Sequence, residues 1–155
     1  MFFMKKYRFS VLCALAAFLS SLCSGCVLVR EYAPQKESIK ANPKEYELAR
    51  QLLVAFVKDD AKTFVSLLPE ETRSKFTVES FKKTRKSVLE SIGEPVAFTY
   101  LTTLKLETLN PQIWKVEFRR HNVNRSKEYT SEVLFKVITG MASNKEAVIT
   151  GFHFL

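Results

Sequence analysis

Apolar residues between positions 42 and 93 recur every three or four residues, which is the spacing of amphipathic helices. The first helix is expected to start at Asn42, which suits the N-cap position, with Pro43 at the first helical position. Glu45 can reach back to the capping amide, as in a capping box. This pattern predicts a helix to about Lys58 with one apolar face: Tyr46, Ala49, Leu52, Leu53 and Phe56.

Two further helices are predicted before the pattern changes. The Asp-Asp pair at 59–60 can end the first helix and cap a short one that ends at Pro69. A third helix should run from Thr77, another cap candidate, to Gly93. Its apolar stripe consists of Val78, Phe81, Val88, Leu89 and Ile92. At 100° per residue Arg85 falls in the middle of this stripe, so it breaks the amphipathic pattern.

From position 96 onward the period changes from 3.6 to 2, which predicts four β-strands. The apolar positions that share a face are Val96, Phe98, Tyr100, Leu104 and Leu106 in the first strand; Trp114, Val116 and Phe118 in the second; Tyr129, Val133, Phe135 and Val137 in the third; and Val148, Thr150, Phe152 and Phe154 in the last. Residues 110–111 mark a turn, and residues 121–126 a hairpin loop.

Charge predicts the register of the second and third strands. One alignment gives two opposite-charge pairs and two apolar pairs, namely Arg119–Glu128, Lys115–Glu132, Phe118–Tyr129 and Trp114–Val133. Exposed ion pairs contribute only about 0.2 to 1 kcal/mol each, so they select the alignment and add little stability.

This order of elements resembles the cone-shaped nuclear transport factor two-like fold, within the broader cystatin-like architecture. The resemblance covers residues 42–155, and it includes the Lys-Asp-Asp end of the first helix, the phenylalanine-bearing helix at 64–68 and the segment Phe-Thr-Val-Glu-Ser-Phe at 76–81. It implies an α+β fold with N-terminal helices packed on a curved antiparallel four-stranded sheet. Members include isomerases, dehydratases, ligand carriers and non-catalytic interaction modules, so the fold alone does not select a function.

The resemblance also implies a cavity between the concave face of the sheet and the helices. An inward aromatic face would line or fill that cavity with Tyr100, Trp114, Phe118, Tyr129, Phe152 and Phe154. The alternative is simple core packing. Arg85 at the cavity edge could bind a carboxylate or phosphate bidentately. Alternatively, its stem packs while its head reaches water or a glutamate.

The sequence offers little for catalysis. An isomerase or dehydratase needs a carboxylate or imidazole base beside a donor for the developing oxyanion. By strand parity His121, His153 and Glu117 point away from the aromatic face, so no acid-base pair faces the cavity. The two isolated histidines have no metal-ligand spacing, and no glycine-rich phosphate loop is present. We therefore expect no catalytic residues, no metal and no cofactor.

The N-terminus has the pattern of a secretory signal. Basic residues at positions 5, 6 and 8 precede an apolar run at 9–22, and Ser24-Gly25-Cys26 closes it. This arrangement resembles the bacterial lipoprotein signal, with Cys23 where that pattern has a residue like Leu. The resemblance implies a signal peptide at 1–25 and a lipidated Cys26. An uncleaved anchor and an ordinary secretory signal are the alternatives, and translation can begin at Met1 or Met4.

Cleavage would leave a polar tether at 26–41 and a single domain at 42–155. The three cysteines all lie within the first 26 residues, so the mature domain would have no disulfide. Val27 in place of Asp resembles signals for outer-membrane delivery, which predicts a periplasm-facing protein.

The net charge of +8 comes from Lys and Arg residues that are interleaved with Glu along the chain. This distribution is typical of a charged surface that keeps a protein in solution. Binding to envelope polyanions or anionic lipid is an alternative, and no motif indicates nucleic-acid binding. The sequence therefore predicts an envelope lipoprotein whose non-catalytic domain binds a partner protein or a small ligand. A cavity enzyme of the isomerase or dehydratase type is the main alternative.

Overall fold

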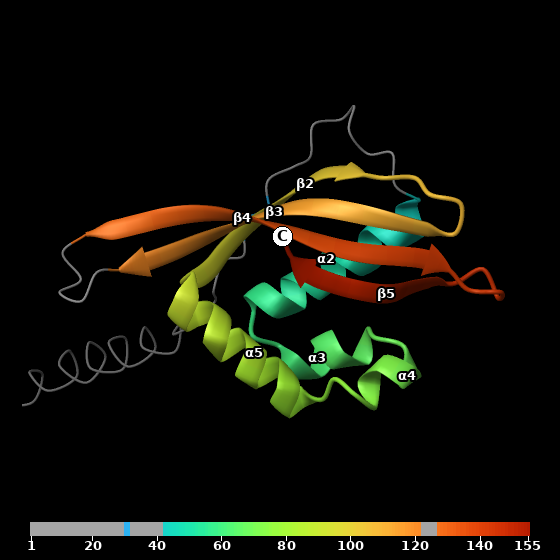
Figure 1. Cartoon of the computed structure of the whole chain (residues 1–155), viewed down its shortest axis with the longest axis horizontal. Helices are drawn as coiled ribbons and strands as arrows, with labels where there is room; N and C mark the ends of the chain where they lie inside the picture. Colours follow the sequence, from blue (N-terminus) through green and yellow to red (C-terminus); the bar gives the residue numbers. More distant parts are fainter. Residues whose placement is uncertain (1–29, 32–41, 122–126) are drawn as a thin grey trace, which may run out of the picture.

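The structure is a computed structural model of the 155-residue chain, and it describes residues 30–31, 42–121 and 127–155. The helices are α2 (Pro43–Val57), α3 (Ala61–Ser66), α4 (Glu70–Arg73) and α5 (Val78–Ser91). The strands are β1 (Arg30–Glu31), β2 (Glu94–Thr103), β3 (Leu109–His121), β4 (Glu128–Met141) and β5 (Ala147–Phe154). Figure 1 shows the helices gathered on one face of a curved sheet, with α2 against the strands and α3 to α5 beside it. The expected α+β architecture is confirmed.

The sheet has the strand order β1-β2-β3-β4-β5. Strands β2 to β5 are antiparallel and are neighbours in chain order, which confirms the antiparallel four-stranded sheet that the resemblance implied. At the β2 edge, β1 adds a two-residue parallel strand, in which Arg30 lies opposite Ala97 and Glu31 opposite Phe98. These two residues belong to the segment expected to be a tether, and they pair because an edge strand presents free backbone donors and acceptors.

The helices begin at the expected caps. The side chains of Asn42, Asp60 and Thr77 accept hydrogen bonds from backbone amides two or three residues further on. None of the described helices is long and apolar enough to cross a membrane. The capping-box role expected for Glu45 is wrong, because its carboxylate instead accepts hydrogen bonds from Asn110 and Thr139 on the sheet.

Gly93 turns the chain from α5 into β2 with φ +123°, a conformation that L side chains rarely adopt. A Cβ atom at this position would lie 2.5 Å from the carbonyl oxygen of Arg119. The turn therefore requires glycine for both its conformation and its space.

The predicted register of the central hairpin is wrong by two residues. Arg119 lies opposite Thr130, and Trp114 lies opposite Phe135. Both expected ion pairs nevertheless form, because long side chains reach the diagonal neighbour across the strands: Arg119 Nε lies 3.1 Å from Glu128 Oε1, and Lys115 Nζ lies 2.8 Å from Glu132 Oε1. A shift of two preserves which residues face the helices.

Irregularities in two strands overturn part of the predicted face assignment. A register shift between Tyr100 and Thr102 breaks the alternation in β2, so Leu104 and Leu106 are 51% and 60% exposed and do not join the inward face. In the β4–β5 pair a second shift brings Ile149 into the core, whereas Val148 and Thr150 were expected there.

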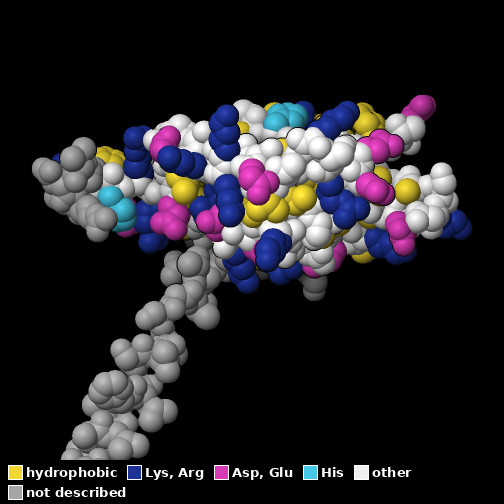
Figure 2. Space-filling view, turned by 90° about the horizontal axis from the view of Figure 1, so that it is seen from below, with side chains coloured by type: hydrophobic (Ala, Val, Ile, Leu, Met, Phe, Trp, Pro, Cys, Tyr) yellow, Lys and Arg dark blue, Asp and Glu magenta, His cyan; other side chains and the backbone are white. Residues whose placement is uncertain are grey.

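The core lies between α2 and the concave face of the sheet. Helix α2 packs on β2, β4 and β5, and its Leu52 and Leu53 are fully buried in the same core as Phe98, Trp114 and Phe118. On the face that Figure 2 shows, Lys and Arg side chains are interleaved with Asp and Glu. This face therefore has no large area of one charge.

Candidate functional site

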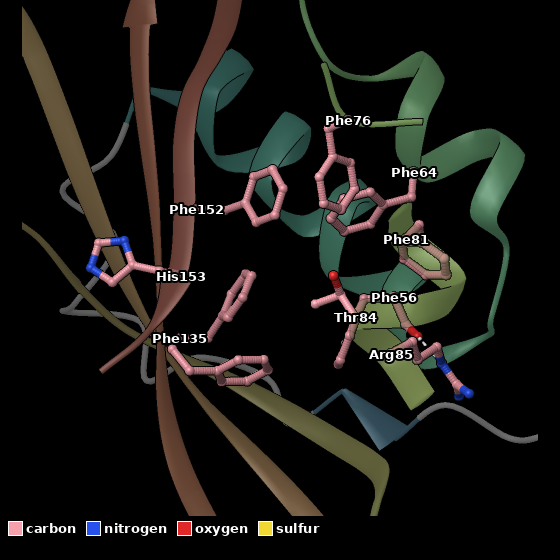
Figure 3. A pocket seen from close by; sticks show the side chains of 10 residues that line it. Phe56, Phe64, Phe76, Phe81, Thr84, Arg85, Phe135, Phe152 and His153 are labelled. Atoms are coloured by element: carbon pink, nitrogen blue, oxygen red, sulfur yellow. Dashed lines mark hydrogen bonds between the residues drawn. The ribbon is translucent and has the colours of Figure 1, made fainter. Parts of the chain in front are cut away.

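A cavity of about 270 Å³ lies where α3 and α5 meet β4 and β5. Seven of the residues that line it are phenylalanines from different elements: Phe56 (α2), Phe64 (α3), Phe76 (before α5), Phe81 (α5), Phe135 (β4), Phe152 and Phe154 (β5). We call this the phenylalanine cavity. In Figure 3 the rings of Phe64, Phe76, Phe81, Phe135 and Phe152 converge on the same space.

Contacts between the rings hold the walls in place. The rings of Phe64 and Phe152 meet edge to face with centroids 5.1 Å apart, and those of Phe76 and Phe152 meet at 5.4 Å. Phe64 also packs on Phe81 at 4.7 Å. Aromatic pairs of this geometry contribute about 0.5 to 1.5 kcal/mol each beyond area burial. Since Phe76 and Phe152 are only partly buried, the wall they form borders solvent.

Arg85 joins the wall of this cavity to the end of α2. Its Nε donates to the carbonyl oxygen of Phe56 at 3.1 Å, and its Nη2 donates to that of Val57 at 3.4 Å. The guanidinium also lies 3.4 Å from a carboxylate oxygen of Asp59, and Figure 3 shows it pointing away from the phenylalanine rings. Arg85 therefore satisfies carbonyl groups at a helix C-terminus, where a cation is favourable.

The structure separates the residues that the sequence grouped as a ligand site. Only Arg85 and Phe152 of that set, with Phe154, line the phenylalanine cavity. Tyr100, Trp114 and Phe118 are at most 3% exposed and fill the core. Tyr129 is 55% exposed near the end of the β3–β4 hairpin.

Five phenylalanines of the wall were missed as site residues by sequence reasoning: Phe56, Phe64, Phe76, Phe81 and Phe135. Phe64 and Phe81 follow the helical spacing that also describes ordinary core packing. The only available signal was the density of phenylalanine itself, with 13 in the chain and three of them within positions 64–81.

The polar side chains at the phenylalanine cavity are few. Besides Arg85 they are Thr84 and His153, and Figure 3 shows the imidazole of His153 directed away from the rings. Among the described lining residues none is Asp or Glu. The described ranges also contain no group of three potential metal-ligating side chains. This cavity can hold an apolar group, and it presents no acid-base pair to it.

Comparison with known proteins places the fold. Neither a protein-family model nor a curated protein matches the sequence. Among solved structures the chain is similar to a ketosteroid isomerase-like protein from Erwinia carotovora atroseptica, with a TM-score of 0.52 and 10% identity over 72% of this chain and 92% of that one.

Two weaker similarities accompany it. A putative SnoaL-like polyketide cyclase from Shewanella denitrificans has a TM-score of 0.47 and 15% identity over 74% of this chain and 90% of that one. A SEC-C motif containing protein from Rhodopseudomonas palustris has a TM-score of 0.47 and 14% identity over 68% and 74%. The likeness to the ketosteroid isomerase-like protein concerns the fold alone at 10% identity, so the chain has the nuclear transport factor two-like fold and no activity is carried over from these proteins.

Proposed function

We propose that this protein is a bacterial envelope lipoprotein whose non-catalytic domain binds an apolar ligand, or the apolar part of a larger partner, in the phenylalanine cavity. The observation that carries the proposal is the cavity itself, with seven phenylalanines and no carboxylate among its described lining residues. Burial of apolar surface drives binding at such a site, at roughly 25 cal/mol per Å².

The size of the cavity supports a small occupant. Apolar cavities of about 150 Å³ bind benzene or xenon, and pockets for drug-sized ligands start at about 300 Å³. A volume of about 270 Å³ therefore suits a substituted aromatic ring, a short acyl chain or one large apolar side chain.

Attachment to the membrane is the second part of the proposal. Its support is the sequence pattern that ends at Cys26, which lies outside the described residues. We expect acylation at Cys26 and delivery to the periplasmic face of the outer membrane. Intact-mass analysis of the membrane fraction tests this, because a mature species that starts elsewhere, or that carries no acyl mass, would refute it.

The two alternatives from the sequence gain less support. A cavity enzyme needs an acid-base pair, and the described lining of the phenylalanine cavity supplies none. A protein that binds polyanions usually has a continuous positively charged surface. On the face shown in Figure 2, positive side chains are interleaved with negative ones.

Substitution at the mouth of the cavity tests the binding proposal. Thr84 lines the cavity but is exposed on α5, so Thr84→Phe should fill the entrance at little cost in stability. Ser87→Phe is the matched control, because Ser87 is an exposed hydroxyl residue on the same helix and is not among the lining residues. The probe is toluene, followed by NMR of ¹³C-labelled phenylalanine rings.

We expect toluene to shift the ring signals of Phe64, Phe76 and Phe152 in the wild type and in Ser87→Phe. Thr84→Phe should weaken this response at least tenfold, as expected when the buried area of a ring-sized ligand is lost. Equal responses in all three proteins, or no response at these rings, would refute the proposal.

A further inference from the structure

A second cavity, of about 410 Å³, lies at the other end of α2. Three segments far apart in the sequence form it: the start of α2 with Asn42 and Glu45, the β2–β3 connection with Thr103 to Asn110, and the end of β4 with Met141. It shares no described lining residue with the phenylalanine cavity. We call it the Glu45 cavity.

The carboxylate of Glu45 is the unusual group in this cavity, because the residue is only 1% exposed. Asn110 Nδ2 lies 3.1 Å from its Oε1 and 2.9 Å from its Oε2. The hydroxyl of Thr139 lies 3.2 Å from Oε2, and Gln112 donates to the backbone oxygen of Glu45 at 2.9 Å. All these partners are neutral.

A buried carboxylate usually has a cationic partner, because burial of an unpaired charge is costly. Within the described part of the chain no side-chain nitrogen of Lys or Arg lies within 4.0 Å of the Glu45 carboxylate oxygens. Its position in the first turn of α2 supplies a partial positive charge from the helix N-terminus, but less than one elementary charge.

The hydrogen bonds around Glu45 also leave capacity for a donor. An ionised carboxylate has about four acceptor sites, and Asn110 and Thr139 occupy three at most. Behind the cavity wall the neighbouring Gln112 Oε1 is buried and has no hydrogen-bond partner within the described residues, although Gln112 itself is not a lining residue. The cluster therefore has more acceptors than donors, which favours a ligand that brings N–H groups and a positive charge.

The rest of the lining is suited to the body of such a ligand. Leu106 is 60% exposed and Met141 is 42% exposed, and both line the Glu45 cavity. Apolar side chains left open beside a buried carboxylate are complementary to an amphipathic cation with an ammonium head and a short apolar tail. Lys105 is also at the cavity, and its ammonium is the internal competitor for Glu45.

We propose that the Glu45 cavity binds a small organic ligand with a primary ammonium group. The ammonium donates to the open acceptor site of the Glu45 carboxylate, and the apolar tail packs against Leu106 and Met141. This site is independent of the phenylalanine cavity, so the binding proposal for one cavity can be refuted while that for the other stands.

The first experiment compares three probes of equal length on the purified full chain in mild detergent: n-butylammonium, 1-butanol and butyrate. Backbone amide shifts at Thr103, Asn110 and Met141 are followed by NMR. We expect saturating shifts with n-butylammonium only, with a dissociation constant on the order of 1 mM, which is reasonable for so small a ligand. Equal shifts with 1-butanol, or none with n-butylammonium, would overturn the proposal without any variant being needed.

The second experiment removes the charge. Glu45→Gln keeps the shape of the side chain, and we expect the affinity for n-butylammonium to fall at least tenfold, as for loss of a charge-assisted hydrogen bond. Glu47→Gln is the matched control, an exposed glutamate on the same helix that hydrogen-bonds Arg50 and Gln51, and it should bind like the wild type.

A third variant tests whether the Lys105 ammonium competes with the ligand for the Glu45 carboxylate. Lys105→Met removes the cation from the cavity, so the affinity for n-butylammonium should stay the same or rise. A loss of affinity in Lys105→Met equal to that in Glu45→Gln would contradict the assigned geometry.

Discussion

Replacement of Arg85 by Met separates a structural from a ligand-binding role for the one residue that breaks the amphipathic pattern of α5. The side chain is 9% exposed, and its guanidinium contacts the last carbonyl groups of α2 and the carboxylate of Asp59. Met retains most of the stem volume but makes none of these polar contacts. The variant therefore removes the Arg85 donors of the Phe56 and Val57 carbonyl oxygens, and the Phe56 oxygen retains only the amide of Asp59 at 3.3 Å.

The expected cost follows from those contacts. Hydrogen bonds to a charged group contribute about 1.5 to 3 kcal/mol, and a cation at a helix C-terminus contributes up to about 2 kcal/mol in a partly buried site. Removal of a buried charge recovers part of the desolvation cost. We therefore expect the free energy of unfolding to fall by about 2 to 4 kcal/mol, a large share of the stability of a small domain.

Urea denaturation followed by circular dichroism measures this change, with Lys86→Met as the control. Lys86 is the next residue on α5, and its side chain is 78% exposed. Its replacement by Met should therefore not change the urea midpoint measurably. Toluene binding should survive in Arg85→Met wherever the protein is folded, since the guanidinium points away from the rings. Unchanged stability together with loss of binding to an anionic ligand would refute the reasoning and make Arg85 a ligand residue.

Two further predictions concern the connections around α3 and α5. Gly93→Ala should destabilise the fold by at least about 2 kcal/mol, because φ is +123° and the new Cβ would lie 2.5 Å from the Arg119 carbonyl oxygen; Gly151→Ala, whose Cβ would make only an ordinary contact, is the control, and equal urea midpoints would contradict the expectation. The pKa of Asp60 is held below its ordinary value of 3.8 mainly by the hydroxyl of Thr63 and then by its amide. A lowered pKa in the folded state stabilises the fold only while the group is ionised. Asp60→Ala should therefore lower the free energy of unfolding by about 1 kcal/mol at neutral pH. The difference in unfolding free energy between the variant and the wild type should shrink as the pH falls from about 4 through the folded-state pKa of Asp60. A difference independent of pH would contradict the capping role.

Helices and strands were predictable because their signals are local. The caps Asn42, Asp60 and Thr77 and the change of period near residue 96 placed four of the helix and strand starts within a few residues of their positions in the structure. The register of β3 and β4 was less determined. The pairs Lys115–Glu132 and Arg119–Glu128 form in the structure across a diagonal, so charge alone does not distinguish two alignments that differ by two residues.

The sites were harder to predict because they depend on packing between distant segments. Strand parity indicated a cavity wall made of strand aromatics, but Trp114 and Phe118 fill the core. The cavity lies where helix residues such as Phe64 and Phe81 meet the aromatic side chains of β4 and β5. Glu45 fits a local capping box in sequence, yet its carboxylate has partners 65 and 94 residues away, and no local pattern indicates contacts at that separation.

The central claim is that the phenylalanine cavity is an open apolar site that takes a ligand. A crystal of the protein under xenon pressure tests it most directly, because xenon enters dry apolar cavities and gives strong anomalous scattering. The account predicts a xenon peak among the rings of Phe64, Phe81 and Phe152, and no such peak in Thr84→Phe. Crystals of the wild type that show no xenon peak in the phenylalanine cavity would contradict it.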